Sequence, residues 1–361
     1  MHLQNLSVIN FKSHKNGEYS FIDGANCFVG NNGVGKTNLL DAIHYLSFTK
    51  SYFNSVDGQN ISHDEEFFVT QGNFLKKDEN FAVHCGVKRG KKKSFKKNKK
   101  EYSRLSQHIG EFPCIMISPA DTALITGTSD LRRKFLDTVI SQTNPEYLNA
   151  LIKYNKVLNH RNALLKSFNQ YNNFDAESLQ IWDDQLIELG SKIHSIRVEF
   201  LVSFKTVFQD YYKFISQNNE EIRITYKSQL TDVNFEKLLQ QNLNRDRITE
   251  HTSVGIHKDD LDFSVNEFPI KKVGSQGQQK SFLIALKLAQ FDITKNVSGF
   301  KPILLLDDIF DKLDDTRVSQ LMQLVSEDNF GQFFISDTHP KRIANIFKDL
   351  KIELNLHNLN P

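Results

Sequence analysis

Cysteine is scarce in this sequence. Only three cysteines occur among 361 residues, at Cys27, Cys85 and Cys114, and no two of them form a C-x-x-C pair. This wide spacing argues against a disulfide framework and against a zinc site built on paired cysteines. Internal repeats and glycine- or serine-rich linkers are also absent. The sequence therefore gives no sign of a repeat array or of a flexible tether.

Long apolar runs are missing as well. No stretch approaches the length of about 20 apolar residues that a membrane-spanning helix needs. The first residues, MHLQNLSVINF, lack the charged-then-apolar layout of a secretory signal. The fractions of 39% hydrophobic and 24% charged residues are typical of a soluble globular protein. We therefore expect a cytoplasmic protein with no membrane partner, built from one large domain or two ordinary ones.

Positive charge is concentrated in one place, although the net charge is only +2. In KRGKKKSFKKNKK, from Lys88 to Lys100, nine of thirteen residues are basic and none is acidic. Such a run can neutralise the backbone phosphates of DNA without reading its sequence. It can equally be a solvated lysine-rich hairpin tip, and the sequence leaves both interpretations open. The candidate DNA contacts are Lys91, Lys92, Lys93, Lys96 and Lys97.

The segment GNNGVGKT fits the phosphate-loop pattern G-x-x-x-x-G-K-[ST]. A strand-like run, Asn26 to Val29, precedes it, and apolar residues at helical spacing follow it. In this context the backbone N–H groups and the helix N-terminus surround phosphate oxygens. The lysine reaches the β and γ phosphates, and the threonine hydroxyl binds Mg²⁺. The predicted ATP-binding residues are Gly30, Asn31, Asn32, Gly33, Val34, Gly35, Lys36 and Thr37.

A second nucleotide motif, ILLLDDIF, is an apolar strand that ends in two acids. We predict that Asp307 holds Mg²⁺ and that Asp308, with Lys36, is catalytic because it orients or deprotonates the attacking water. The alternative is an acidic strand end that faces solvent. Lys36 and Asp307 are 271 residues apart, so a large insertion must separate the two motifs.

Three further motifs resemble those of ABC-type ATPases. GSQGQQKS matches the signature motif and opens a predicted helix from about Gln278 to Phe291. KLDD, with Asp314, resembles the D-loop, and THP places His339 where these proteins have a switch histidine that senses the γ phosphate. In the ABC architecture the signature completes the ATP site of a second subunit, so the resemblance implies an ATP-dependent homodimer. An ordinary helix cap is the alternative. The signature residues are Ser275, Gln276, Gly277 and Gln278.

Hydrophobic periodicity divides the chain. Short β-rich runs fill Leu3 to Ser118, a helical block covers about Ser129 to Ser216, and β character returns near His251. We therefore predict an α/β fold: an ABC-type P-loop ATPase head with an inserted helical arm domain. Residues 1–120 and 250–361 would form the discontinuous ATPase lobe, and residues 121–249 would form the arm.

Further segments along nearly the whole chain match one family. They are NFKSH (Asn10 to His14), GKTNLLDAIHYLS (Gly35 to Ser47), SP with Asp121, DLRRKFLD (Asp130 to Asp137), VLNHRNALLK (ending at Lys166), WDDQLIELG (Trp182 to Gly190) and GIHKDDL (Gly255 to Leu261). With these segments the chain resembles the RecF family of DNA replication and repair ATPases, which is related to the heads of chromosome-organising proteins. The sequence departs from the usual family pattern at Asn31, Ile256, Lys258 and Lys280.

The resemblance implies an ATP-dependent DNA-binding clamp that acts in repair, recombination and replication restart. Its partners would be DNA at junctions or gaps, a second copy of the chain, and other mediator proteins that load the recombinase and support SOS induction. Its cofactors would be ATP and Mg²⁺. Because Asp308 is one methylene shorter than the usual glutamate, we expect slow hydrolysis. The resemblance implies that DNA stimulates this hydrolysis.

Three other functions stay in view. An ABC transporter subunit would need a membrane partner. A chromosome-organising or double-strand-break-repair head would need long coiled coils, for which the insertion is too short and lacks sustained heptads. A DNA-binding module without ATPase activity remains the third alternative. The Q-loop has no secure equivalent in this sequence.

Two weaker groups lie near the insertion. Arg132 and Arg133 occupy the first turn of a predicted helix, where positive charge opposes the dipole, so an anionic partner is expected. That partner could be DNA or simply Asp130 and Asp137. His257, Asp259 and Asp260 resemble a metal-ligand set, but a cluster of hydrogen bonds at a strand end is the favoured interpretation.

Overall fold

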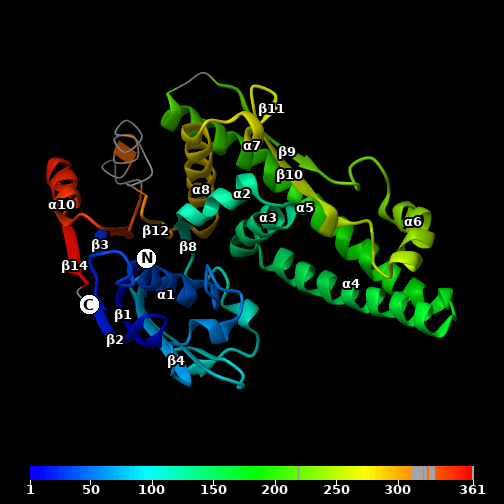
Figure 1. Ribbon diagram of the computed structural model, residues 1–361, viewed down its shortest axis with the longest axis horizontal. Helices are drawn as coiled ribbons and strands as arrows, with labels where there is room; N and C mark the ends of the chain where they lie inside the picture. The colour runs from blue at the N-terminus through cyan, green and yellow to red at the C-terminus, as the bar shows by residue number, and fades with distance from the viewer. Residues whose placement is uncertain (218–219, 310–319, 321–322, 325–329, 360–361) are drawn as a thin grey trace. The chain divides into compact units, whose positions relative to one another are not determined.

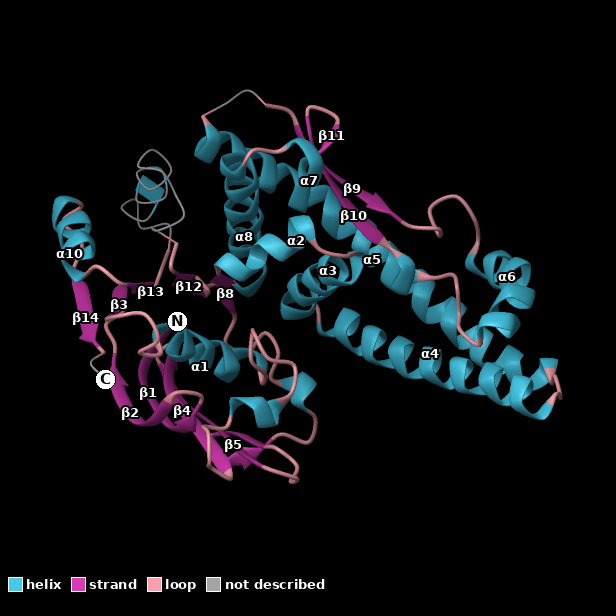
Figure 2. Ribbon diagram, viewed as in Figure 1, coloured by secondary structure: helices cyan, strands magenta, loops and turns pink. Residues whose placement is uncertain are grey.

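The computed structural model describes residues 1–217, 220–309, 320, 323–324 and 330–359. The chain divides into two compact units. The first unit comprises Met1–Asp121, Tyr211–Asn218 and Gln276–Pro361, and the second comprises Thr122–Asp210 and Asn219–Ser275. Figure 1 follows the chain by residue number, and Figure 2 shows its helices and strands. No helix in these described ranges combines the length and apolarity needed to cross a membrane.

A five-stranded parallel sheet forms one layer of the first unit. Its strand order is β14-β3-β13-β12-β8, so strands from both ends of the chain pair side by side. Residues of β3, β8, β12 and β13 are buried throughout, as expected for parallel strands covered on both faces. The strands are β3 (Ala25–Val29), β8 (Cys114–Ile117), β12 (Ile303–Asp307), β13 (Phe333–Asp337) and β14 (Leu354–Asn358).

An antiparallel sheet forms a second layer of the same unit, with strand order β2-β1-β4-β5-β6-β7. Its strands alternate between buried and more exposed residues, most clearly in β4, because one face packs on the core and the other faces water. The strands are β1 (His2–Phe11), β2 (His14–Ser20), β4 (Phe67–Lys76), β5 (Glu79–Lys88), β6 (Ser94–Lys97) and β7 (Lys100–Glu101).

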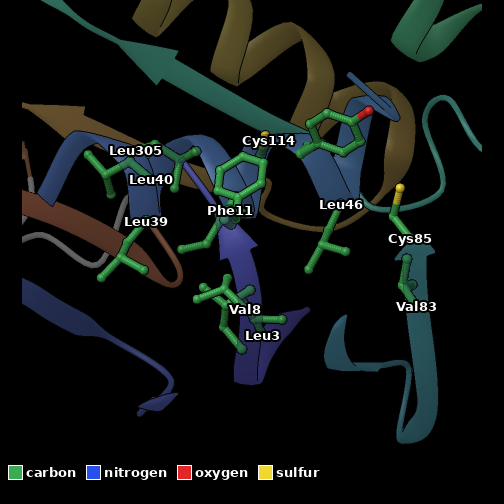
Figure 3. Packing of buried hydrophobic residues seen from close by; sticks show 14 of the residues in the cluster. Leu3, Val8, Phe11, Leu39, Leu40, Leu46, Val83, Cys85, Cys114 and Leu305 are labelled. Carbon is green, nitrogen blue, oxygen red and sulfur yellow. The ribbon is translucent and has the colours of Figure 1, made fainter. Parts of the chain in front are cut away.

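Helix α1 (Lys36–Phe48) packs against strands of both sheets. Eleven of its thirteen residues are buried, which identifies it as a core helix rather than a surface one. Figure 3 shows Leu39, Leu40 and Leu46 of this helix near Phe11 and Leu305 from the two sheets. The first unit also contains α8 (Gln276–Ser298), α10 (Pro340–Asp349), η1 (Asp57–Asn60) and η2 (Leu105–Gln107).

Long helices and a small sheet make up the second unit. The sheet has the order β11-β10-β9 and is antiparallel. The helices are α2 (Ala123–Thr126), α3 (Ser129–Thr143), α4 (Pro145–Tyr171), α5 (Ala176–Ser216, whose last turns belong to the first unit), α6 (Phe235–Thr249) and α7 (Ile270–Val273). The strands are β9 (Ile222–Lys227), β10 (Asp260–Val265) and β11 (Phe268–Pro269), and η4 (Ile256–Lys258) is a short turn. The turn η3 (Pro119–Thr122) lies at the boundary, with Pro119 to Asp121 in the first unit and Thr122 in the second.

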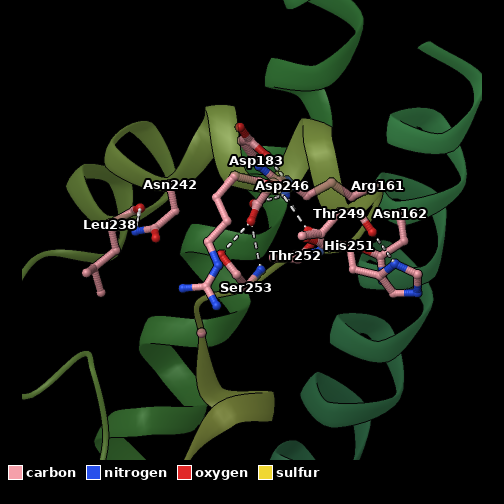
Figure 4. Close-up of polar contacts among 12 residues, drawn as sticks. Arg161, Asn162, Asp183, Leu238, Asn242, Asp246, Thr249, His251, Thr252 and Ser253 are labelled. Carbon is pink, nitrogen blue, oxygen red and sulfur yellow. Dashed lines mark hydrogen bonds and ion pairs between the residues drawn. The ribbon is translucent and has the colours of Figure 1, made fainter. Parts of the chain in front are cut away.

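A buried arginine joins three segments of the second unit. The Arg161 guanidinium on α4 is fully buried and binds Asp183 Oδ1 at 2.5 Å and Asp246 Oδ2 at 2.7 Å. It also donates to Thr252 Oγ1 at 3.0 Å, as Figure 4 shows. The Ser253 N–H donates to Asp246 at 2.9 Å. A buried charge is tolerable only with such partners, so these contacts fix α6 and the following loop on α4 and α5.

The helical block predicted from Ser129 to Ser216 is confirmed as α3, α4 and α5. The compact units nevertheless differ from the predicted division at 121–249. Residues 250–275 group with the second unit, because β10 pairs along its length with β9. The end of α5 groups with the first unit, where the Tyr212 ring packs against Phe282 of α8 with centroids 6.4 Å apart.

Candidate nucleotide site

The loop between β3 and α1 contains glycines in backbone conformations that other residues rarely adopt. Gly30 and Gly35 have φ angles of 152° and 100°, a region that side chains disfavour. A Cβ at Gly35 would lie 2.4 Å from His14 Nε2, and one at Gly30 would lie 2.4 Å from the Leu359 carbonyl oxygen. Both positions therefore require glycine. Residues Asn31, Asn32, Gly33 and Val34 complete the loop, and Lys36 and Thr37 begin α1.

Lys36 lies folded over this loop. Its Nζ donates to the carbonyl oxygens of Gly30 at 2.8 Å and Asn31 at 3.0 Å, and the residue is only 5% exposed. These bonds hold the ammonium group beside the loop backbone, from where it could also donate hydrogen bonds to phosphate oxygens. The role predicted for Lys36 at the phosphates stays a prediction.

The two predicted Mg²⁺ ligands meet despite their separation in sequence. Thr37 Oγ1 donates to Asp307 Oδ1 at 2.7 Å. Ser336 Oγ, at the end of β13, donates to the same oxygen at 2.8 Å, and Ser118 Oγ, just after β8, donates to Oδ2 at 3.3 Å. Parallel strands end at one edge of their sheet, which is where ligands bind in open α/β sheets. A hydroxyl and a carboxylate at this distance are the hard oxygen donors that Mg²⁺ prefers.

Asp308 and His339 lie at the same edge of the parallel sheet. Asp308 has a left-handed backbone with φ of 44°, and its N–H donates to Ser336 Oγ at 2.9 Å. His339 caps α10 directly after β13 and donates its N–H to Asp337 Oδ1 at 2.6 Å. The His339 side chain is 66% exposed, so its ring is accessible to a ligand at this edge.

The predicted signature residues lie at the start of α8. The helix begins at Gln276 and includes Gly277 and Gln278, and Ser275 immediately precedes it as an exposed residue. The expectation that this motif opens a helix is confirmed, although α8 is longer than predicted at both ends. The positive end of a helix dipole favours an anion at a helix N-terminus. The predicted D-loop residue Asp314 lies outside the described residues.

The lysine-rich run occupies the β5–β6–β7 hairpins, and its side chains fall into two classes. Lys91 and Lys92 are exposed in the first turn. Lys93 is 12% exposed and pairs with Asp57 at 2.9 Å, and Lys97 pairs with Glu111 at 2.6 Å. Lys96 lies opposite His84 in the sheet. The two paired lysines thus have structural partners, and the predicted DNA role keeps its support chiefly at Lys91 and Lys92.

Arg132 and Arg133 contact neither of the acids that we considered from the sequence. Arg132 makes a two-point contact with Asp260, at 2.7 Å from Nε and 2.9 Å from Nη2, and these bonds raise its pKa. It also donates to the Gly127 carbonyl oxygen at 2.9 Å, and Arg133 donates to the Asp259 carbonyl oxygen at 2.7 Å. Both arginines therefore hold α3 against the start of β10.

The His257 region is a hydrogen-bond cluster, as the sequence favoured. His257 Nδ1 lies 2.9 Å from Tyr154 Oη, and Nε2 lies 3.0 Å from the Thr252 carbonyl oxygen. Burial lowers the pKa of His257 to about 4. Asp259 accepts from the buried Arg197 at 2.7 Å. Across the ranges that the structure describes, no group of three or more histidine, cysteine, aspartate and glutamate residues is arranged to hold a metal ion.

Several polar residues around the site were missed from the sequence. Ser118 and Ser336 contact Asp307 as described above, and the β1–β2 turn also closes on the phosphate loop. There Ser13 Oγ accepts from Asn38 at 2.8 Å, and His14 Nε2 lies 3.0 Å from the Gly35 carbonyl oxygen. Ser118 and Ser336 each stand at the end of an apolar strand. Because parallel strands end together at one sheet edge, this position could have predicted that both serines lie near Asp307.

Comparisons with known proteins show which family this chain resembles. Residues 2–355 match the family model described as RecF/RecN/SMC N terminal domain. The chain is 50% identical to the DNA replication and repair protein RecF of Flavobacterium johnsoniae, over 99% of this chain and 100% of that protein.

Solved structures of two proteins share this fold. A structure of the recombination mediator protein RecF with ATP in the RecFOR pathway is 30% identical, with a TM-score of 0.87 over 93% of this chain and 92% of that one. The Smc head domain of Pyrococcus furiosus is similar in fold at 17% identity, with a TM-score of 0.56 over 95% of this chain and 91% of that one.

Proposed function

Since this chain belongs to the RecF family of DNA replication and repair proteins, we propose that it is an ATP-dependent DNA-binding clamp. The observation that carries this proposal is the convergence of Lys36, Thr37 and Asp307. Thr37 and Asp307 are 270 residues apart in sequence and 2.7 Å apart in space. This contact supports the proposal because it brings the loop proposed to hold phosphate beside the carboxylate proposed to hold Mg²⁺, the two parts that nucleotide hydrolysis requires.

ATP and Mg²⁺ fit the residues at this sheet edge. The loop from Gly30 to Gly35 would hold the phosphates through its N–H groups, with Lys36 beside them. Thr37 and Asp307 would hold Mg²⁺, which would supply positive charge to stabilise the phosphates. Ser118 and Ser336 orient the Asp307 carboxylate by hydrogen bonds to its two oxygens, as supporting residues do at metal sites.

Asp308 is the proposed catalytic carboxylate. Its backbone N–H is fixed by Ser336, so the direction of its short side chain depends on the end of β13. The carboxylate would orient the attacking water, and His339 would contact the γ phosphate. Because the aspartate reaches one methylene less far than a glutamate, the water is positioned less well and hydrolysis is slow. Slow hydrolysis suits a timed switch.

The signature at the start of α8 would complete the ATP site of a second copy of this chain. Two copies would then enclose two nucleotides between Ser275–Gln278 of one and the phosphate loop of the other. Hydrolysis would separate them, so ATP would control the assembly of the clamp. The exposed position of Ser275 and Gln276 supports this assignment.

The clamp would hold DNA at single-strand/double-strand junctions or gaps, with Lys91 and Lys92 on its backbone. Together with other mediator proteins it would assist recombinase loading, recombination, replication restart and SOS induction. The recombination mediator protein RecF that shares this fold is described in the RecFOR pathway, which supports partners of this class.

The test measures DNA affinity at fixed salt with gapped, single-stranded and duplex DNA of one sequence. With ATP and Mg²⁺ we expect affinity for gapped DNA to exceed that with ADP by about tenfold, equivalent to 1.4 kcal/mol. Gapped DNA should also accelerate ATP hydrolysis. Equal affinity with ATP and ADP, together with hydrolysis that DNA does not change, would contradict the proposal.

A further inference from the structure

A charged residue lies in the most buried part of α8. From Ser281 to Phe291 every residue of this helix is buried, and Lys287 is the single charged residue among them. Removing an ammonium group from water is costly unless it is paired and hydrogen-bonded. Lys287 has such partners: its Nζ lies 2.9 Å from Asp121 Oδ1 and donates to Tyr52 Oη at 2.9 Å.

The partners of Lys287 come from two other segments of the first unit. Asp121 follows β8, and Tyr52 follows α1. The Tyr52 hydroxyl donates to Asp121, and burial together with the Asp121 carboxylate raises the pKa of Tyr52, so this hydroxyl stays protonated. Lys287 and Asp121 are each about 5% exposed at the side chain. The three side chains therefore form a closed triangle, in which Lys287 and Asp121 are buried and Tyr52 is partly buried.

The triangle is connected to the magnesium carboxylate. Asp121 accepts from the Ser118 N–H at 2.8 Å through its second oxygen. The Ser118 hydroxyl in turn donates to Asp307 Oδ2 at 3.3 Å. Tyr52 also donates its N–H to Asp41 of α1 at 2.6 Å. One continuous set of polar contacts thus joins Asp307, the end of β8 and the middle of α8.

We propose that Lys287 and Asp121 are positioning residues that couple the nucleotide site to the helix carrying the signature. Lys287 lies nine residues after Gln278, about 14 Å along a continuous helix at 1.5 Å per residue. A displacement of Ser118 that follows a change at Asp307 is therefore passed to α8 and moves the start of the helix. This inference rests on the proposed function. It states how a change at the nucleotide site of one chain would move that chain's own signature, which binds the ATP of the second copy.

Three variants separate coupling from simple structural support. Lys287→Met leaves Asp121 buried without its cation and should lower folding stability. Adding Asp121→Asn removes both charges, while the amide oxygen still accepts from the Ser118 N–H, so stability should largely return. Lys76→Met is the control. It removes a lysine of the same unit whose Nζ donates to the Glu111 carbonyl oxygen at 2.7 Å, a hydrogen bond that involves neither α8 nor Asp307.

The deciding measurement is amide hydrogen exchange in residues 279–291, with and without ATP and Mg²⁺, at concentrations where the protein is monomeric. In the wild type and in Lys76→Met, ATP should slow exchange of this helix by about threefold or more, since exchange reports local opening. The double variant should bind ATP as the wild type does but show no such slowing. In sedimentation its ATP-dependent dimer should be about tenfold weaker.

Recovery of both stability and the ATP-dependent slowing in the double variant would overturn the inference, since the pair would then only support the fold. A wild-type protein that binds ATP with no change in α8 would also overturn it. Failure of the proposed function would give different results. The wild type would then not bind ATP, or it would stay monomeric with ATP even though ATP slows hydrogen exchange in its α8. Lys287→Arg, which keeps the charge beside Asp121, should restore part of the slowing.

Discussion

Replacing Lys91 and Lys92 with glutamine should weaken DNA binding without affecting folding, whereas Lys93→Gln should do the reverse. Lys91 and Lys92 are exposed in the turn after β5, so each can neutralise one phosphate. The slope of log affinity against log salt changes by about 0.9 for each duplex phosphate neutralised, so the double variant should lose about 1.8. Exposed substitutions of this kind change folding stability by less than about 0.5 kcal/mol.

Lys93 has a different environment. Its Nζ pairs with Asp57 at 2.9 Å and donates to the Thr49 carbonyl oxygen at 2.5 Å and to Tyr45 Oη at 3.2 Å. Losing hydrogen bonds made by a charged group costs about 1.5–3 kcal/mol, and the partial exposure of Asp57 places the expected loss near the lower figure. Lys93→Gln should therefore lower the urea midpoint and leave the salt slope unchanged.

Two assays check these expectations on the same proteins. Fluorescence anisotropy with labelled gapped DNA gives the salt slope, and urea unfolding gives the stability. An unchanged slope in Lys91→Gln/Lys92→Gln would mean that the run is a solvated hairpin without a DNA contact. A flattened slope with unchanged stability in Lys93→Gln would refute the separation of the two lysine classes.

Three further outcomes test the nucleotide site and the buried histidines. Lys36→Ala should lower ATP affinity by about 3 kcal/mol, or a hundredfold, through loss of charged hydrogen bonds to phosphate; unchanged affinity in equilibrium dialysis would refute the phosphate-loop assignment. Asp308→Asn should bind ATP normally and hydrolyse it at least about tenfold more slowly, and wild-type turnover in single-turnover assays would show that another residue positions the water. Burial lowers the pKa of His44, His108 and His257 to about 4, so the unfolded chain binds more protons between pH 6.5 and 4, and stability should fall across that window as the pH drops; urea midpoints that agree at pH 7 and pH 4.5 would contradict this.

Local patterns predicted much of the fold because they depend on nearby residues. Helical spacing located α3, α4 and α5, and the glycine pattern located the loop before α1. The strand β9 was missed, and the pairing of β9 with β10 could not be derived, because it joins segments more than thirty residues apart. Edge strand β14 and helix α6 were also not predicted. Their apolar patterns are short, and their packing partners lie elsewhere in the chain.

The candidate site was predictable where one motif carries one role. Lys36, Thr37 and Asp307 followed from motifs whose chemistry fixes their place, and the structure brings Thr37 and Asp307 together. The contact of Arg132 with Asp260 spans 128 residues and depends on how α3 lies on β10. No spacing along the chain could show that Arg132 is paired with this carboxylate.

The most direct test of the central claim is sedimentation of the Ser275→Arg variant with ATP and Mg²⁺. The wild type should double its mass from 41.7 kDa when ATP is added. The variant should bind ATP like the wild type, because its own phosphate loop is unchanged, yet stay monomeric, because a long charged side chain enters the closed interface. Mixing it with Lys36→Ala protein should restore some dimer, since each mixed pair keeps one intact loop facing one intact signature. A Ser275→Arg protein that dimerises with ATP as readily as the wild type would contradict the composite site.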